Sequence, residues 1–299
     1  MTPILLTGVQ GQLGRQLHRS LQPLGDVITL DQQQLDLANP DAIRAALRDI
    51  KPAVIVNPAA WTAVDLAETE SDLAHAINTV APGVLAEEAH RLDALLVHYS
   101  TDYVFDGGKQ APWLESDAAV PLNVYGRSKL AGEQAIAASH CRHLIFRSSW
   151  IYGRHGANFL RTMLRLAAER DQLRIVGDQI GAPTWSRTLA DATALALARY
   201  AGQNGVHHVA ANDHTSWCGF AAAIIEGARR RGMLTQQPDI QPITSAEYPT
   251  PAPRPLNSRL DCSKLAADFN LHLPSWRRQL DLCLDDMCDE TTQKTPAAP

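Results

Sequence analysis

Thr7-Gly8-Val9-Gln10-Gly11-Gln12-Leu13-Gly14 follows directly on the apolar run Ile4-Leu5-Leu6 near the start of the chain. An apolar run, a glycine-rich turn and a helix-compatible segment predict a strand, a turn and a helix in that order. Glycines at this spacing permit a tight turn, close approach of the backbone to a pyrophosphate and close packing of the helix on the strand. The helix N-terminus adds N–H donors and a partial positive charge. The segment therefore predicts a dinucleotide-binding loop built on Gly8, Gly11 and Gly14.

Asp31 closes the next apolar run, residues 27–30, at about the spacing (roughly 20 residues) expected after such a loop. An acidic side chain at this place accepts the hydroxyl groups of an adenosine ribose. Its charge disfavours a phosphate on that ribose and favours NADH, whereas Arg15 offers a compensating cation for NADPH. The residues alone leave the choice between NADH and NADPH open.

Short apolar runs alternate with predicted helices through the first half of the chain. The runs are residues 4–6, 27–30, 54–56, 95–99 and 144–147, and the helices are residues 11–24, 41–49, 72–91 and 126–138. Runs that are apolar at nearly every position are typical of strands covered on both faces. We therefore expect an α/β fold with a doubly wound, Rossmann-like parallel sheet. Ligand-binding residues of such a sheet lie at the carboxyl ends of its strands.

Tyr125 and Lys129 lie four residues apart in a segment predicted to be helical, so both lie on one face. A phenol is a poor acid or base at neutral pH, because its unperturbed pKa is about 10. A neighbouring ammonium stabilises the phenolate and lowers that pKa toward the working range. Together with a dinucleotide loop, the pair indicates a hydride-transfer site.

Composition restricts the class of protein. The chain has 299 residues, 45% of them hydrophobic, which suffices for one large or two interlocked domains. Its net charge of −5, without a long basic stretch, argues against a nucleic-acid partner. No apolar run is long enough to span a bilayer or resembles a secretory signal, so we expect a cytoplasmic protein without a membrane partner. The five cysteines and 11 histidines form no metal-binding motif.

Longer motifs indicate a family. They are residues 57–65 (NPAAWTAVD), 100–107 (STDYVFDG), 121–129 (PLNVYGRSK), 147–150 (RSSW), 178–184 (DQIGAPT) and 254–260 (RPLNSRL). With the glycine loop they resemble the extended short-chain dehydrogenases/reductases, and within these the dTDP-4-dehydrorhamnose reductases. The resemblance extends over nearly the whole chain.

The resemblance implies that NADPH or NADH reduces the 4-keto group of dTDP-4-dehydro-L-rhamnose, giving dTDP-L-rhamnose for cell-surface polysaccharides. Tyr125 is then the acid, Lys129 tunes it and positions the cofactor, and Thr101 hydrogen-bonds the substrate oxygen. The implied cofactor contacts are Gly11, Gln12 and Leu13 at the pyrophosphate, Asp31 at the ribose, Asp36 and Leu37 at the adenine, and Ala60, Trp61, Thr62 and Tyr99 at the nicotinamide half.

The implied sugar-nucleotide contacts are Thr101, Asp102, Trp150, Arg254 and Asn257. Trp150 helps to exclude water from the hydride path, and a core tryptophan is the alternative for this residue. Arg254 and Asn257 are candidates for the nucleotide pyrophosphate, because guanidinium geometry suits phosphate oxygens. An ion pair that bridges two domains is the alternative for Arg254.

The resemblance also implies the domain organisation. Residues 1–150 are expected to form the dinucleotide-binding domain, with part of residues 187–212 returning to its sheet. Residues 151–288 are expected to form most of a smaller, interleaved α/β substrate domain, with helices at residues 158–170, 188–200 and 216–231. Residues 289–299 have little to bury and are predicted to be a disordered tail. We expect a monomer or a homodimer.

Three other functions occur on similar chains. Sugar-nucleotide dehydratases of this superfamily have an Asp-Glu pair after the threonine, and here Asp102 is followed by Tyr103, which disfavours dehydration. A nucleotide-sugar 4-epimerase is disfavoured by the longer motifs alone. The regulatory subunit of methionine adenosyltransferase, an interaction protein, has a closely similar chain, and intact Thr101, Tyr125 and Lys129 do not exclude it.

Some members of the family bind Mg²⁺ at a dimer interface through glutamates. The corresponding positions here are Gln16 and Arg187. A neutral amide and a cation do not form a site for a hard divalent ion. We therefore expect no metal-binding residues, although the family leaves Mg²⁺ possible.

Overall fold

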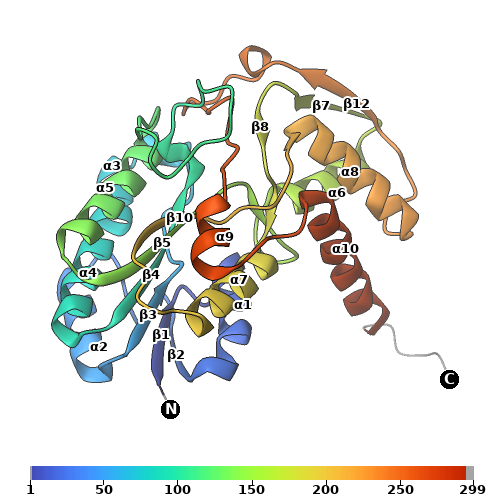
Figure 1. The fold of residues 1–299 in the computed structure, drawn as a ribbon. Helices are drawn as coiled ribbons and strands as arrows, with labels where there is room; N and C mark the ends of the chain where they lie inside the picture. Colours follow the sequence, from blue (N-terminus) through green and yellow to red (C-terminus); the bar gives the residue numbers. More distant parts are fainter. Residues whose placement is uncertain (1, 294–299) are drawn as a thin grey trace.

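A computed structural model gives the fold of residues 2–293 (Figure 1). Parallel strands form the central sheet in the order β10-β5-β4-β3-β1-β2. They are β1 (Pro3–Thr7), β2 (Asp26–Leu30), β3 (Val54–Asn57), β4 (Leu95–Thr101), β5 (Arg142–Ser148) and β10 (Gly205–His208). The predicted doubly wound parallel sheet is confirmed, and each predicted apolar run is a strand.

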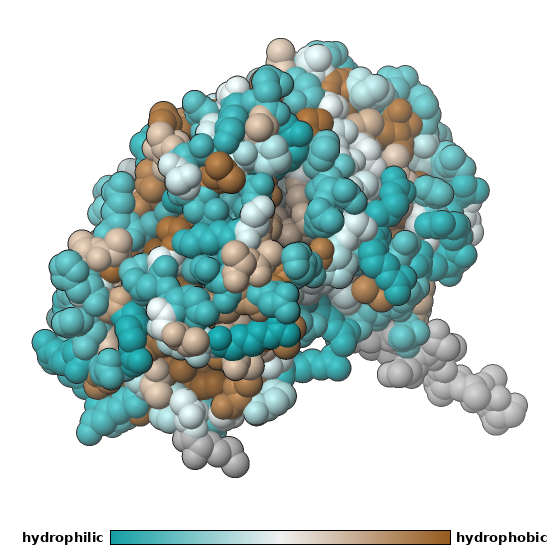
Figure 2. Space-filling view, viewed as in Figure 1, coloured by the Kyte–Doolittle hydropathy of each residue, from teal (hydrophilic) through white to brown (hydrophobic). Residues whose placement is uncertain are grey.

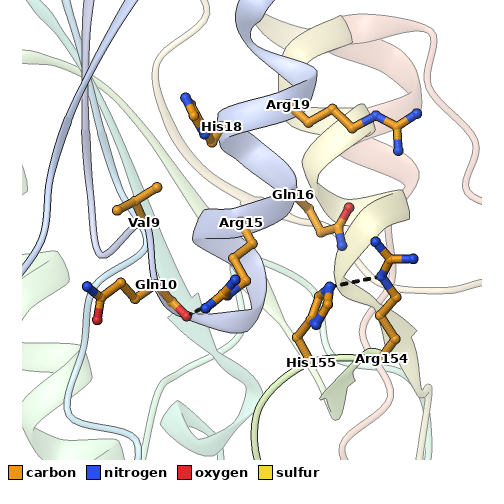
Figure 3. Close-up of a pocket in the computed structure, with 8 residues that line it drawn as sticks. All are labelled: Val9, Gln10, Arg15, Gln16, His18, Arg19, Arg154 and His155. Carbon is orange, nitrogen blue, oxygen red and sulfur yellow. Dashed lines mark hydrogen bonds between the residues drawn. The ribbon is translucent and has the colours of Figure 1, made fainter. Parts of the chain in front are cut away.

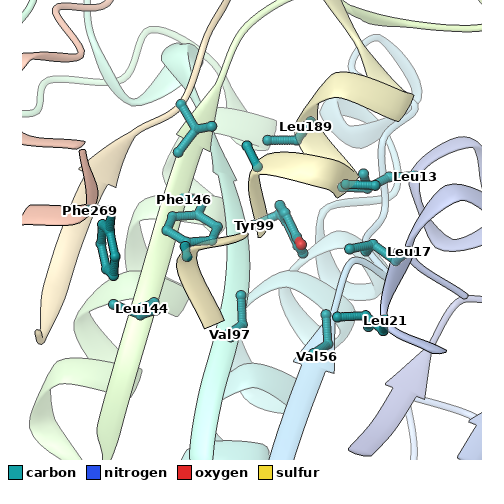
Figure 4. Close-up of a cluster of buried hydrophobic side chains, with 14 of the residues drawn as sticks. Leu13, Leu17, Leu21, Val56, Val97, Tyr99, Leu144, Phe146, Leu189 and Phe269 are labelled. Carbon is teal, nitrogen blue, oxygen red and sulfur yellow. The ribbon is translucent and has the colours of Figure 1, made fainter. Parts of the chain in front are cut away.

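The sheet is buried on both faces, because successive strand residues point to opposite sides and both sets are apolar. The residues on one side are Leu5, Ile55, Leu96 and Ile145, and those on the other are Leu6, Val56, Val97 and Phe146. The first side packs on α2 (Pro40–Ile50), α4 (Ala81–Leu92) and α5 (Val124–Ala138). The second packs on α1 (Gln12–Ser20), α7 (Ser186–Ala198) and α9 (Ser263–Phe269), as Figure 4 shows for part of this core.

The predicted helix 72–91 is one helical stretch with a local irregularity. It consists of α3 (Ser71–His75), a π-helical turn (Ala76–Val80) and α4. A π turn inserts an extra residue into the helix and is frequent at functional sites. Here it carries Asn78, which is completely buried and faces α5 across Gly132.

A second core lies beside the sheet, on the right in Figure 1. Its helices are α6 (Phe159–Glu169), α8 (Trp217–Arg230) and α10 (Trp276–Gln293). Its strands are the pairs β7 (Gln172–Val176) with β12 (Asp239–Ile243), β8 (Ile180–Gly181) with β11 (Thr215–Ser216), and β6 (Ile151–Tyr152) with β9 (Thr184–Trp185). Aromatic side chains fill this core, among them Phe105, Trp113, Phe220 and Trp276.

The chain passes between the two cores several times. Phe105 and Trp113, which follow β4, pack in the second core, whereas α7 and β10 return to the first. The excursion of residues after β4 was not expected from the sequence. The division into residues 1–150 and 151–288 stays a prediction. The disordered tail at residues 289–299 also stays a prediction: α10 extends to Gln293, and residues 294–299 lie outside the described part of the chain.

The face of the molecule in Figure 2 contains both hydrophilic and hydrophobic residues. Hydrophobic residues are scattered among hydrophilic ones, as is ordinary for a protein surface. Among residues 2–293, no helix combines the length and hydrophobicity that crossing a membrane requires.

We predict that Gly132→Ala destabilises the fold. A Cβ at Gly132 would overlap the backbone oxygen of Asn78, so α5 must move away from the π turn. Overpacking of this kind costs about 1–3 kcal/mol, which lowers Tm by several degrees in a chain of this size. Gly83→Ala in α4 is the matched control, because its Cβ would meet only the Ala135 methyl at 3.3 Å. Equal Tm values for the two variants, measured by thermal unfolding, would contradict the prediction.

Candidate active site

The loops after β1, β2, β3 and β4 converge at one edge of the sheet. β2 lies on one side of β1, whereas β3, β4 and β5 follow one another on its other side, so the order of the strands across the sheet reverses at β1. Ligands of open α/β sheets bind at this kind of switch point, outside the carboxyl ends of the strands. The loops after β1 and β3 approach each other so closely that a Cβ on Gly8 would lie 2.8 Å from Cβ of Ala59.

The glycine loop has the geometry that a pyrophosphate requires. Gly8 has φ +56°, which favours glycine, and the N–H of Gly11 donates to its carbonyl oxygen at 3.0 Å. A Cβ on Gly14 would overlap that same oxygen. Helix α1 starts at Gln12 without a side-chain cap, whereas α2, α5, α6 and α8 have Asn or Ser caps. Its first N–H groups, including those of Gln12 and Leu13, are thus not used by a capping side chain.

Asp31 has two roles at the end of β2. Its Oδ1 accepts the N–H groups of Gln33 and Gln34 at 2.9 and 3.0 Å, which closes a turn, and its Oδ2 accepts Nε2 of Gln10 at 3.0 Å. Arg15 donates from Nε to the carbonyl oxygen of Gln10. The carboxylate therefore lies beside the glycine loop, as expected for a ribose contact.

The two residues expected at the adenine, Asp36 and Leu37, differ in their exposure to solvent. Asp36 is exposed and caps its own turn by accepting the N–H of Ala38 at 2.9 Å. Leu37 is buried and belongs to the core between the sheet and α2. Its contact with the adenine stays a prediction.

The loop after β3 contains Ala60, Trp61 and Thr62, which are at least partly exposed. Asn78 holds this loop by accepting the N–H of Trp61 at 2.9 Å and donating to its carbonyl oxygen at 3.0 Å. The same amide donates to Oγ of Ser128 in α5. Asn78 therefore links the expected nicotinamide loop to the helix that carries Tyr125 and Lys129.

Tyr125 lies in the first turn of α5, beside Tyr103, with ring centroids 5.6 Å apart. Burial raises the pKa of Tyr125 to about 12, a hydrogen bond with Thr101 lowers it, and the charge of Asp102 raises it. Lys129 is not among the groups that shift this pKa, and its tuning of Tyr125 stays a prediction. The desolvation of the phenol dominates, and the ammonium is directed at other atoms.

Lys129 is almost completely buried, with 2% of its surface exposed. Its Nζ donates to the carbonyl oxygen of Tyr99 at 2.6 Å and lies 3.2 Å from Nε2 of His98. Burial lowers the pKa of Lys129 to about 8, and the charge of Glu133 opposes that shift. The lysine is thus held rigidly at the carboxyl end of β4.

Tyr99 has its side chain in the core between the sheet and α7, and its contact with the nicotinamide half stays a prediction. Its phenol points into the core, where it hydrogen-bonds Thr193 of α7 at 2.8 Å (Figure 4). Alternation along β4 explains this, because residues 98 and 100 face the other side of the sheet. Only the backbone of Tyr99 lies at the site.

Thr101 and Asp102 end β4 next to Tyr125. Oγ1 of Thr101 donates to Oδ1 of Asp102 at 3.2 Å. Burial raises the pKa of Asp102 to about 7, against a hydrogen bond from Ser258 that lowers it. Oδ2 of Asp102 is buried without a partner. A hydroxyl and a carboxyl group therefore meet beside the phenol.

Trp150 follows β5 with φ +48°, a strained conformation for a bulky residue. Its ring stacks on Trp217 with centroids 3.5 Å apart and 8° between the planes. Gly181 lies against its edge, where a Cβ would be 2.5 Å from the indole. Trp150 is partly exposed and fixed in orientation, which differs from an ordinary core tryptophan.

Arg254 and Asn257 have partners within the protein. Nη2 of Arg254 pairs with Oδ2 of Asp65 at 2.8 Å, an ion pair between segments remote in the sequence, as in the alternative considered above. Asn257 donates to the carbonyl oxygens of Lys109 and Ala111 and accepts from Arg259. These bonds make Asn257 a link between two loops, and its contact with the nucleotide stays a prediction.

Three comparisons with known proteins bear on this site. The model of the family described as "RmlD substrate binding domain" matches residues 1–288. The dTDP-4-dehydrorhamnose reductase of Burkholderia thailandensis is 47% identical over 298 residues, covering 96% of this chain and 99% of the relative. The chain belongs to the dTDP-4-dehydrorhamnose reductase family.

Solved structures agree with that assignment. The reductase of Bacillus anthracis in complex with NADP has a TM-score of 0.89 and 34% identity, covering 96% of this chain and 100% of that one. The UDP-glucose 4-epimerase of Thermus thermophilus, in complex with NAD, has a TM-score of 0.80 at 19% identity over 95% of this chain and 98% of that one. The second likeness shows the shared fold alone.

A metal site of the kind found in some members of the family does not fit this chain. Gln16 lines a pocket of about 370 Å³ beside α1, together with Arg15, Arg19, Arg154 and His155 (Figure 3). Arg187 pairs with Asp286 at 3.1 Å, and Arg154 pairs with the same carboxylate at 3.3 Å. Two guanidinium groups therefore contact the Asp286 carboxylate, and their positive charges repel a divalent ion.

Sequence reasoning missed His98, Asn78 and Trp217. His98 is a polar residue inside the apolar run 95–99, and this exception was the available signal. Asn78 and Trp217 gave no comparable signal, because their partners are remote in the sequence.

We predict that Gly181→Ala disrupts the stack of Trp150 on Trp217. The added Cβ occupies the space of the Trp150 ring, so the indole must rotate. The exciton-coupled circular dichroism of the stacked pair should be lost, as in a Trp217→Phe reference variant. Gly177→Ala is the control, since its Cβ would meet Pro242 at a tolerable 3.3 Å. An unchanged spectrum in Gly181→Ala would show that the ring is held by other contacts.

Proposed function

We propose that this chain reduces the 4-keto group of dTDP-4-dehydro-L-rhamnose with NADPH or NADH to give dTDP-L-rhamnose, for cell-surface polysaccharide biosynthesis. The observation that carries the proposal is the meeting of Tyr125, Thr101 and Lys129 at the edge of the parallel sheet where the glycine loop also lies, in a chain of this family. The test is direct. Purified protein is incubated with reduced cofactor and the keto sugar, and the sugar formed is identified.

The cofactor supplies a hydride to C4 of the sugar when it is bound. Tyr125 serves as the acid, and its high pKa keeps the phenol protonated at working pH until oxygen at C4 acquires negative charge. Thr101 orients that oxygen through its hydroxyl group. The Lys129 ammonium, one helical turn along α5, offsets the charge left on the phenolate.

The geometry of the edge supports the proposed cofactor residues. Gly8, Gly11, Gln12, Leu13 and Gly14 suit the pyrophosphate, because the backbone can approach closely and the start of α1 lacks a side-chain cap. Asp31 suits the adenosine ribose, with exposed Asp36 at the adenine. Ala60, Trp61 and Thr62 suit the nicotinamide half. The NADP-bound relative supports this class of cofactor.

Trp150, Thr101 and Asp102 are the proposed sugar contacts, since Thr101 and Asp102 act on the phenol from the end of β4 and Trp150 follows β5, the neighbouring strand. Arg254 is the proposed pyrophosphate contact of the nucleotide. Its guanidinium has five N–H donors, and the bonds to Asp65 and to the carbonyl oxygen of Ala252 leave donors for a phosphate.

The keto-sugar experiment separates this proposal from its alternatives. Steady turnover excludes a purely regulatory subunit of the methionine adenosyltransferase type. Net oxidation of the cofactor distinguishes a reductase from an epimerase, which recovers its cofactor. The same proposal places the protein in the cytoplasm as a monomer or homodimer, without a nucleic-acid or membrane partner.

We predict that Tyr125→Phe lowers turnover by roughly 10² to 10⁴, because it removes a positioned acid. The fold and the cofactor Kd should be unchanged, as measured by thermal unfolding and fluorescence titration. Tyr152→Phe is the matched control, because it removes a phenolic hydroxyl that is buried without a partner in the second core. Full activity in Tyr125→Phe would overturn the mechanism.

We predict that Asp31→Asn shifts preference toward NADPH. Asparagine keeps an oxygen for the turn formed with Gln33 and Gln34 but loses the charge that repels a ribose phosphate. A pair of unit charges about 4 Å apart interacts by about 1 kcal/mol in water, so the ratio of kcat/KM for NADPH to that for NADH should rise by roughly fivefold. Asp26→Asn, at the opposite end of β2, should leave the ratio unchanged. Equal ratios in the two variants would show that Asp31 does not face the ribose.

A further inference from the structure

His98 is a completely buried histidine that contacts the site from inside the sheet. It lies on β4, with Nε2 3.2 Å from Nζ of Lys129 and Nδ1 3.1 Å from the side-chain amide of Asn57. Asn57 in turn pairs with Oγ1 of Thr7 at 2.6 Å. A line of four side chains therefore connects α5 with the ends of β4, β3 and β1.

The ring of His98 is uncharged. Burial, followed by the charge of Lys129, holds its pKa well below the usual range. A neutral imidazole has one donor nitrogen and one acceptor nitrogen. An ammonium only donates, so Nε2 must be the acceptor toward Lys129 and Nδ1 must carry the proton. In the structure the Asn57 nitrogen faces Nδ1 and its oxygen accepts from Oγ1 of Thr7. A 180° turn of the amide exchanges its oxygen and nitrogen, and the oxygen then accepts the N–H of Nδ1 while the nitrogen donates to Thr7.

An ammonium has three N–H groups, and two have fixed acceptors here, the Tyr99 carbonyl oxygen and His98 Nε2. We propose that His98 is a positioning residue for Lys129, which stabilises the buried ammonium as a neutral acceptor and leaves its third N–H for the Tyr125 phenol and the cofactor ribose. The inference rests on the proposed function for its catalytic meaning, but not for its geometry.

The charges around Lys129 make a neutral acceptor important. Glu133, one turn along α5, is engaged by Arg147 of β5 through bonds of 2.9 and 2.6 Å. Tyr125 is the titratable neighbour on the other side, and Asp102 acts on Tyr125 rather than on the lysine. The carboxylate whose charge acts on the ammonium is therefore shared with a guanidinium, and His98 supplies part of the remaining compensation.

Removal of this acceptor should lower the pKa of Lys129 below its value of about 8, because a hydrogen bond to the charged form favours that form. The stabilised form is the ammonium, present below the pKa and lost as pH rises through it. A variant without the acceptor therefore loses the ammonium, and the activity that needs it, at a lower pH.

The test compares His98→Asn with His98→Gln. Asparagine can still reach Asn57 but is too short to reach Lys129, whereas glutamine places an amide oxygen near the position of Nε2. The titration of Lys129 is followed by NMR on protein with ¹³C-labelled lysine, without substrate or cofactor. We expect the midpoint to fall by about one pH unit or more in His98→Asn and to stay within a few tenths of the wild type in His98→Gln.

The same shift is expected in the alkaline limb of the kcat/KM profile. His207→Asn is the matched control, because His207 is also completely buried in the sheet but bonds Asp268 on the far side, away from Lys129. It should lower Tm without moving the Lys129 midpoint. If His98→Asn fails to fold, Asn57→Ala tests the same point by releasing the other ring nitrogen, and it should shift the midpoint in the same direction.

An unmoved midpoint in His98→Asn overturns the proposal, and so does an equal shift in His98→Gln or His207→Asn, which would indicate altered packing. Because the NMR titration needs no turnover, a chain that fails to reduce the keto sugar would overturn the proposed function and leave this inference to be decided separately.

Discussion

The two helices that carry the candidate site, α1 and α5, contact neighbouring backbone at glycines, where there is no space for a side chain. A Cβ on Gly14 would overlap the backbone oxygen of Gly8, and a Cβ on Gly126 that of Tyr103, in addition to the contact of Gly132 with Asn78. These contacts fix the distance of α1 and α5 from the strand ends. Since each helix is rigid, they also fix the glycine loop relative to Tyr125 and Lys129. Hydride transfer tolerates little error in such a distance.

The parts of the fold that follow from local pattern were predictable. Apolar runs gave the five strands up to β5, because buried parallel strands have a simple composition. The glycine loop, Asp31 and Thr101 lie at strand ends for the same topological reason. The Tyr-Lys spacing placed both residues on α5. In each case the signal and its cause lie within a few residues of each other.

The remainder depends on contacts between distant segments. The Tyr99 side chain points into the core because its phenol hydrogen-bonds Oγ1 of Thr193. The Asn257 amide donates to two carbonyl oxygens because residues 109–111 pass beside it. The pKa of Tyr125 is set by burial, and the partner of Lys129 is a histidine from another strand. No short motif encodes these pairings, and Phe105 and Trp113 likewise join a core whose other members come later in the chain.

The late return of β10 to the sheet has a consequence for biosynthesis. β5 ends at Ser148, but its outer neighbour begins at Gly205, with the whole of α6 and α7 between them. While the ribosome synthesises those residues, the nascent sheet has an open edge formed by Leu144, Ile145 and Phe146. An apolar edge of this kind pairs readily with other strands. The emerging chain therefore passes through an aggregation-prone interval, which ends when β10 leaves the exit tunnel and covers the edge.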